Sequence, residues 1–160
     1  MDALFQTQSN ELSTTTQKEK LFKDAERQWN TLSTEKGAPG RKVDFEIYKS
    51  ILYNLEIRKV YLDSKLSLEK FSSIVGTNTT YLSNAVNNYF GCNFKRLINS
   101  YRVARAKELL DGKDCPVSEL FSRCGFASKS VFYVAFRKVV GMTPLQYISQ
   151  SRNPFMIQRN

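Results

Sequence analysis

Two stretches of this sequence follow one pattern: Leu68-Glu-Lys-Phe-Ser-Ser-Ile-Val-Gly76 and Val117-Ser-Glu-Leu-Phe-Ser-Arg-Cys-Gly125. Each has apolar residues at helical spacing and then a glycine, the residue best able to adopt the left-handed backbone that ends many helices. A polar residue that can cap a new helix follows each glycine, namely Asn78 in the first copy and Ser128 in the second. The pattern predicts two units, each made of a short helix, a turn and a longer helix.

The similarity between the two copies continues past the turn glycines, where the offset rises from 49 to 50 residues. The aligned pairs are Leu82 with Phe132, Ala85 with Ala135, Val86 with Phe136, Phe90 with Val140, Gly91 with Gly141 and Ile98 with Ile148. Leu82 and Phe132 follow the caps by four residues, so both should point into a core. We expect the core of the second unit to contain Leu120, Phe126, Val131, Phe132, Phe136 and Val140.

Positive charge is concentrated in the part of the chain that contains the repeat. The 160 residues carry a net charge of +9. Residues 1–40 hold five Lys and Arg against six Asp and Glu, whereas residues 41–160 hold 19 against nine. A basic domain of this size favours a polyanionic partner, either nucleic acid or an acidic membrane surface. The alternative is a set of cations that only keeps the surface soluble.

Between the copies, residues 94–110 have the apolar periodicity of one long helix, which Gly112 is expected to end. At ~1.5 Å per residue this helix would be about 25 Å long. A spacer of that order can hold two reading helices roughly one DNA turn, or ~34 Å, apart. Strand signals are weak, so the predicted fold class is all-α: two helix-turn-helix subdomains, homeodomain-like units, joined by a long linker helix.

Composition argues against several other classes of protein. Histidine is absent, which removes His-based acid–base catalysis and the commonest metal ligand. Cys92, Cys115 and Cys124 are an odd number without paired spacing, so we expect reduced thiols in a cytoplasmic protein. No apolar run approaches the ~18–20 residues of a membrane span, and the N-terminus does not resemble a signal peptide. We expect no enzyme activity, no cofactor, no metal and no small-molecule site.

The N-terminal part of the chain lies outside the repeat. Residues 1–17 are rich in Thr, Ser, Gln and Asn and are expected to form a flexible lead; a helix over residues 18–36 and a Gly-Ala-Pro-Gly linker over residues 37–40 follow. That helix is too short to be stable alone. Its apolar stripe, which includes Trp29, must pack on the basic domain, pair with a second copy or meet an absent upstream region. We favour the last two, and expect the protein to bind its partner without residues 1–40.

The sequence is predicted to divide into four segments. Residues 1–40 form the N-terminal lead and its helix, and residues 41–64 contain a helix that leads into the domain. Residues 65–150 form the domain with the two repeats, and residues 151–160 form a tail.

Further spacings within residues 65–150 match a known family. The strongest segment is Gly125-Phe-Ala-Ser128 with Phe132, Phe136-Arg-Lys138, Gly141-Met-Thr143-Pro144 and Tyr147, supported by Leu68 to Gly76, Tyr81-Leu-Ser83 and Arg102-Val-Ala-Arg-Ala106-Lys-Glu-Leu-Leu110. These residues resemble the DNA-binding domain of the AraC family of bacterial transcription regulators. The resemblance implies seven helices, two reading helices in successive major grooves, and control of transcription with double-stranded DNA and RNA polymerase as partners.

By motif position, the resemblance also implies which residues meet DNA. The first reading helix would offer Thr80, Ser83, Asn84 and Asn87, and the second Lys129, Ser130, Tyr133 and Val134. The expected phosphate contacts are Lys95, Arg96, Arg102, Arg137 and Lys138. For each residue the alternative is an exposed side chain without a partner. For the whole protein the alternative is a basic helical interaction module that docks on a protein partner or an acidic surface.

Three positions depart from the family pattern. Phe121 replaces a small residue before the second turn, so the helices of that unit are expected to cross at a different angle. Val134 replaces a long polar residue, so weaker base reading is expected, and Ile148 replaces a frequent Arg. Family members often carry a further effector, dimerisation or sensor domain. The sequence of residues 78–83 is similar to the branch of the family in which this domain forms the end of a long membrane-linked sensor. Self-association would then use the N-terminal or an upstream region.

Overall fold

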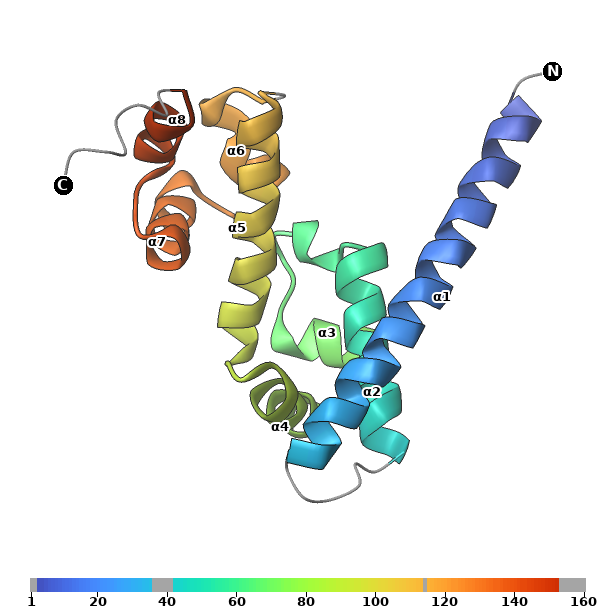
Figure 1. The fold of residues 1–160 in the computed structure, drawn as a ribbon. Helices are drawn as coiled ribbons and strands as arrows, with labels where there is room; N and C mark the ends of the chain where they lie inside the picture. Colours follow the sequence, from blue (N-terminus) through green and yellow to red (C-terminus); the bar gives the residue numbers. More distant parts are fainter. Residues whose placement is uncertain (1–2, 36–41, 114, 153–160) are drawn as a thin grey trace. The chain divides into compact units, whose positions relative to one another are not determined.

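The structure is a computed structural model, and it describes residues 3–35, 42–113 and 115–152. All regular structure in these ranges is helical, which confirms the predicted all-α class (Figure 1). The ranges contain eight α-helices, and six of these begin within residues 65–150, where the resemblance implies seven. The chain divides into two compact units. Unit 1 is formed by Met1–Val60 and Ser67–Asn93, and unit 2 by Tyr61–Leu66 and Phe94–Asn160.

The first helix, α1, is longer than the sequence indicated. It spans Ala3–Glu35, so helix replaces the flexible lead expected over residues 1–17. The polar composition of this stretch was misleading, because it contains neither Gly nor Pro to break a helix. A helix that is already nucleated can extend at low cost, one hydrogen bond for each residue added. The expected linker over residues 37–40 lies outside the described residues.

The second half of α1 packs within unit 1. Ala25 and Trp29 are buried with Tyr48 and Leu52 of α2, which spans Lys42–Leu52. The Tyr48 hydroxyl donates a hydrogen bond of 2.9 Å to Gln28 Oε1 of α1. The favoured alternatives for the Trp29 stripe, a second copy or an upstream region, are therefore corrected to the first, packing on the rest of the chain.

The apolar surface that α1 covers extends to the C-terminal end of α4. The Trp29 ring centroid lies 4.7 Å from that of Tyr89, and the Tyr48 ring centroid lies 5.3 Å from that of Phe90. The Tyr89 hydroxyl also donates to Asp44 Oδ2 of α2 over 3.0 Å. The first helix-turn-helix thus shares its core with α1 and α2.

The first helix-turn-helix consists of α3, Leu68–Val75, and α4, Thr79–Phe90. A π-helical turn at Tyr53–Ile57 and a 3-10 turn at Val60–Leu62 lead into it from α2. Gly76 ends α3 in the left-handed region, and the Asn78 side chain accepts a 2.8 Å hydrogen bond from the Tyr81 backbone N–H. These contacts confirm the turn glycine and the cap, and Leu82 is fully buried as predicted.

Unit 2 contains the expected linker helix α5, Phe94–Gly112, followed by α6, Val117–Arg123, α7, Lys129–Val140, and α8, Pro144–Arg152. The side chain of Ser128 caps α7 by accepting from the Val131 backbone N–H. Of the six predicted core residues, four are buried, namely Leu120, Phe126, Phe132 and Phe136. Val140 is partly buried and packs against them. The prediction for Val131 is wrong, since its side chain is 49% exposed.

Unit 2 also contains a segment from much earlier in the sequence. We call Tyr61–Leu66 the strap, because it precedes α3 in the chain yet packs against α5 and the α6–α7 turn. The Tyr61 ring lies 5.5 Å from the Tyr101 ring of α5. Gly125, in the left-handed region at φ +87°, is so close to the strap that a Cβ atom there would lie 2.8 Å from Leu62 Cα. The α6–α7 turn therefore requires glycine for its conformation and for its contact with the strap.

The small-residue position before each turn differs between the copies as the sequence indicated. Ser72 in α3 is buried, whereas Phe121 in α6 is half-buried and packs against the core of unit 2. Helix α6 also ends at Arg123, so one more residue separates its end from the turn glycine than in the first copy. The different crossing angle in the second unit stays a prediction.

Candidate nucleic-acid interface

Helix α4 presents an outward face of hydroxyl and amide groups. At about 100° per residue, Asn84 lies opposite the buried Leu82 and Val86. The predicted residues Thr80, Asn84 and Asn87 are exposed and Ser83 is half-buried. Helix α4 contains no charged residue at all. Its face therefore offers side chains that can donate and accept hydrogen bonds, as the edges of bases in a major groove require.

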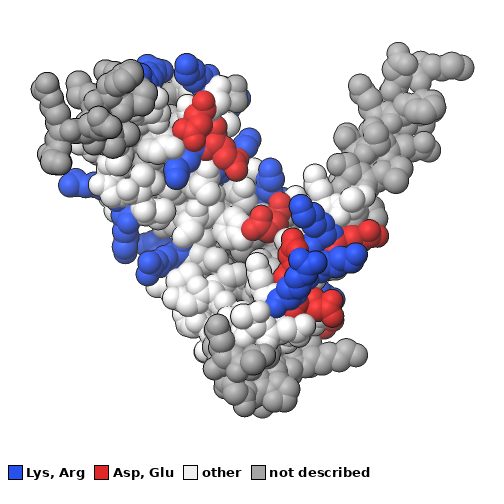
Figure 2. Space-filling model, viewed as in Figure 1, with Lys and Arg blue, Asp and Glu red and all other residues white. Residues whose placement is uncertain are grey.

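Helix α7 presents a basic face in unit 2. The exposed residues are Lys129, Ser130, Val134, Arg137 and Lys138, while Tyr133 is half-buried. The Tyr133 ring meets the Phe132 ring edge-on at 5.7 Å, and Lys129 Nζ lies 5.7 Å from the Tyr133 centroid. No acidic residue occurs in α7, and Figure 2 shows Lys and Arg over this helix without Asp or Glu beside them on the face in view.

The predicted cations of α5 divide into two kinds. Lys95 and Arg96 lie in the first turn of the helix and are exposed. Arg102 is different: its Nε donates to the Tyr61 carbonyl over 2.7 Å and its Nη2 to the Asp63 carbonyl over 2.9 Å. Its guanidinium carbon also lies 5.5 Å from the Phe126 ring centroid.

The strap therefore engages the Arg102 guanidinium, and a phosphate contact from this residue stays a prediction. Burial lowers the pKa of the Arg102 guanidinium, while the nearby Asp63 carboxylate opposes that shift. The group nevertheless remains charged at neutral pH, because the ordinary pKa of arginine lies far above 7. A charged donor to two carbonyls makes the stronger kind of hydrogen bond.

Sequence reasoning missed two residues on these outward faces. Val131 had been assigned to the core, although it lies only about 60° around α7 from Val134. Asn88 of α4 is exposed and aligns with Lys138 in the repeat. The signal for both was available in the helical register of the two copies.

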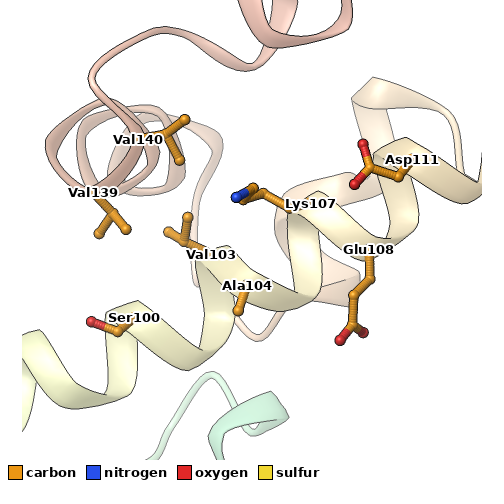
Figure 3. Close-up of a pocket in the computed structure, with 8 residues that line it drawn as sticks. All are labelled: Ser100, Val103, Ala104, Lys107, Glu108, Asp111, Val139 and Val140. Atoms are coloured by element: carbon orange, nitrogen blue, oxygen red, sulfur yellow. The ribbon is translucent and has the colours of Figure 1, made fainter. Parts of the chain in front are cut away.

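An open hollow of about 550 Å³ lies between α5 and α7 in unit 2 (Figure 3). Val139 and Val140 form its wall on α7, and six residues line it from α5: Ser100, Val103, Ala104, Lys107, Glu108 and Asp111. The three charged side chains point in different directions, and Asp111 accepts a 3.0 Å hydrogen bond from the Tyr147 hydroxyl. The hollow thus lacks the convergent polar groups that usually orient a small ligand.

Buried and half-buried titratable groups of unit 2 have shifted pKa values. Burial raises the pKa of the Cys124 thiol to about 12, so this cysteine stays protonated and unreactive at neutral pH. Burial, with a smaller contribution from the hydrogen bond to Asp111, raises the pKa of Tyr147.

Among the described residues, no group of His, Cys, Asp and Glu is arranged to hold a metal ion. Nor does any helix in the described ranges have the length and apolar character to cross a membrane.

Known proteins share this helix-turn-helix pattern. A family model described as a helix-turn-helix domain matches residues 71–150. Over 91 residues the chain is 32% identical to the HTH-type transcriptional activator RhaR of an Enterobacter species. The aligned residues make up 57% of this chain and 32% of RhaR. The chain is also similar to the solved structure of a transcriptional regulator with an AraC-type DNA-binding domain from Chromobacterium violaceum, with 25% identity and a TM-score of 0.50. That alignment covers 56% of this chain and 80% of the other.

The chain belongs to the AraC family of transcription regulators. A second solved structure, the C-terminal domain of AraT, a response regulator from Geobacillus stearothermophilus, has a TM-score of 0.59 and 28% identity. The alignment covers 66% of this chain and 84% of the AraT domain.

The AraC-family match includes α4, α7 and the linker helix α5, because residues 71–150 begin inside α3 and end inside α8. Helix α1 and α2 lie outside it, although they complete the core of unit 1. The chain spans about a third of the length of RhaR.

Proposed function

We propose that this chain binds duplex DNA in a sequence-specific way and regulates bacterial transcription. Helices α4 and α7 would each enter a major groove. The observation that carries the proposal is the shared register of the two helices. Each is capped at its start, buries one apolar face and exposes an opposite face that lacks acidic groups.

The two reading helices would have different tasks in this proposal. The hydroxyls and amides of α4, on Thr80, Ser83, Asn84 and Asn87, would read base edges. The cations Lys95, Arg96, Arg137 and Lys138 would meet phosphates, with Lys129, Ser130 and Tyr133 near the bases on α7. Phosphate contacts fix orientation and affinity, whereas base contacts carry sequence information.

Selection from a pool of random duplexes, followed by sequencing of the bound fraction, tests the function as a whole. We expect one enriched site with two half-sites about one turn of DNA apart. Recovery of bound duplexes without any enriched sequence would contradict the proposal. That result would favour the alternative, a basic helical module that docks on a protein partner or an acidic surface.

Replacement of Asn84 by alanine tests base reading by α4. Asn84 is exposed at the centre of the outward face, so the change should leave the fold intact and remove up to two hydrogen bonds to one base. We expect a loss of about 1–3 kcal/mol on the selected duplex and relaxed preference at one base pair. Titration of the selected and a scrambled duplex measures both affinities and their ratio. Thr31→Ala, on the exposed surface of α1, is the control. An unchanged ratio of the two affinities would show that Asn84 does not read a base.

Replacement of Arg137 by alanine tests phosphate binding by α7. Since phosphates are common to all sequences, affinity should fall equally for the selected and the scrambled duplex. The slope of log affinity against log salt should also become shallower by about 0.9 for the one phosphate lost. Arg27→Ala is the matched control, because Arg27 is an exposed arginine of α1. Loss of affinity for the selected duplex alone would assign Arg137 to base reading.

The remaining parts of the proposal concern the cellular setting. RNA polymerase would be the target of regulation, the location would be the cytoplasm, and self-association would use the N-terminal region. No catalytic step is needed for a regulator of this kind.

A further inference from the structure

The outward face of α7 contains two exposed valines. Val134 is 70% exposed and Val131 49% exposed. At about 100° per residue, Val134 lies at the centre of the face, with Ser130, Arg137 and Lys138 within about 60° of it. Val131 lies about 60° away on the same face. The core of unit 2 is made from the opposite side of α7, by Phe132 and Phe136.

Neither packing nor helix stability accounts for valine at these positions. An exposed side chain gains little from the hydrophobic effect, because little of its surface leaves water. Valine is also less favourable in a helix than alanine, lysine or glutamine, since its branched Cβ loses rotational freedom. In α4 the aligned residue is the polar Asn84. The repeat therefore places an amide on one reading helix and an isopropyl group on the other.

We propose that Val134, with Val131 beside it, recognises the C5-methyl group of thymine in the half-site bound by α7. The proposal rests on the DNA-binding function given above and deepens it. Thymine is the base whose major-groove edge carries an apolar group, and aliphatic contact with that methyl is the way an uncharged, non-hydrogen-bonding side chain can distinguish a base. Arg137 and Lys138 flank Val134 and bind the phosphates that bring the helix against the base edges.

The two half-sites are then read by different chemistry. The half-site of α4 is read mainly through hydrogen bonds from its hydroxyl and amide side chains. The half-site of α7 is read through apolar contact, so the protein distinguishes thymine from uracil there, although both bases present the same hydrogen-bonding groups. This difference assigns a recognition role to the position where the family pattern had indicated only weaker reading.

Deoxyuridine substitution tests the proposal with the full chain. Each thymine of the duplex obtained by selection is replaced in turn by deoxyuridine, which removes only the methyl group. We expect affinity to fall about three- to fivefold at one or two positions, all within one half-site, as for loss of one buried methyl group. The variant Val134→Ala should bind the thymine duplex more weakly and lose its sensitivity to deoxyuridine at those positions.

Val139→Ala is the matched control. Val139 is 47% exposed on the same helix, but it lies about 140° from Val134 and lines the hollow beside α5 (Figure 3). This variant should keep the deoxyuridine sensitivity of the parent protein. A second variant, Val134→Asn, introduces the residue of α4 and should shift the preferred base at the affected position from thymine to adenine.

The outcomes separate this proposal from the broader one. An enriched duplex that binds equally well with deoxyuridine at every thymine overturns the methyl contact and leaves sequence-specific binding in place. Sensitivity that persists in Val134→Ala overturns the assignment to Val134. A selection without any enriched duplex overturns the proposed function, and the methyl contact with it.

Discussion

Replacement of Gly125 by alanine should destabilise unit 2 more than any other glycine substitution in the described turns. Two costs add at this position. The left-handed backbone at φ +87° costs an alanine about 1–2 kcal/mol, and the new methyl group would meet the backbone of the strap at Tyr61 and Leu62. Displacement of packed backbone costs typically about 1–3 kcal/mol more. We therefore expect a loss of about 2–5 kcal/mol in the free energy of unfolding.

Gly141→Ala is the matched control for Gly125→Ala. Gly141 lies in the same unit at φ +84°, and no atom lies within 4 Å of the position that a Cβ would occupy. Only the cost of the backbone conformation, about 1–2 kcal/mol, is expected there. Denaturant unfolding followed by circular dichroism measures both, and hydrogen exchange locates the loss in α6 and α7. Equal destabilisation by the two variants would show that the strap does not lie against Gly125.

Replacement of Trp29 by alanine should destabilise unit 1 by about 3–5 kcal/mol, the usual cost of truncating a buried aromatic side chain. Trp29 is buried, and its ring packs at 4.7 Å on Tyr89 and at 5.6 Å on Phe45 and Tyr48. The change leaves a cavity between α1, α2 and the end of α4. Thermal unfolding measures the loss, with Thr31→Ala on the exposed side of α1 as its control.

Hydrogen exchange gives the Trp29→Ala experiment its sharper readout. If α1 is part of unit 1, the backbone amides of α2 and α4 should exchange faster in the variant than in the parent. Unchanged protection of both helices would mean that α1 does not contribute to the core in solution. The earlier expectation of an independent N-terminal segment would then be restored.

The helix-turn-helix units could be predicted from the sequence because their signals are local. A turn glycine, a capping residue and an apolar residue four positions later occur within a few residues of each other, as in Gly76, Asn78 and Leu82. The repeat gives this pattern twice, which made the fold class secure. The outward residues of α4 and α7 follow from the same register, so their exposure could be predicted as well.

The features that were missed depend on contacts between distant parts of the chain. No local pattern indicates that Arg102 binds carbonyls 39 and 41 residues earlier in the sequence. The aromatic residues at the end of α4 gave no sign that α1 would cover them. Val131 is a different case, since its hydrophobic side chain was taken as evidence of burial and its helical register was overlooked.

The strap also affects how unit 2 is assembled during synthesis. During synthesis, Gly125 follows Tyr61 by 64 residues. At 5–20 residues per second, the turn against which the strap packs is therefore made roughly 3–13 s after the strap itself. Unit 1 has all its segments by Asn93, and it can fold while unit 2 is still being made. The same discontinuity limits dissection in the laboratory. A fragment that begins at Phe94 includes α5 to α8, but it leaves the Arg102 guanidinium without its two carbonyl acceptors.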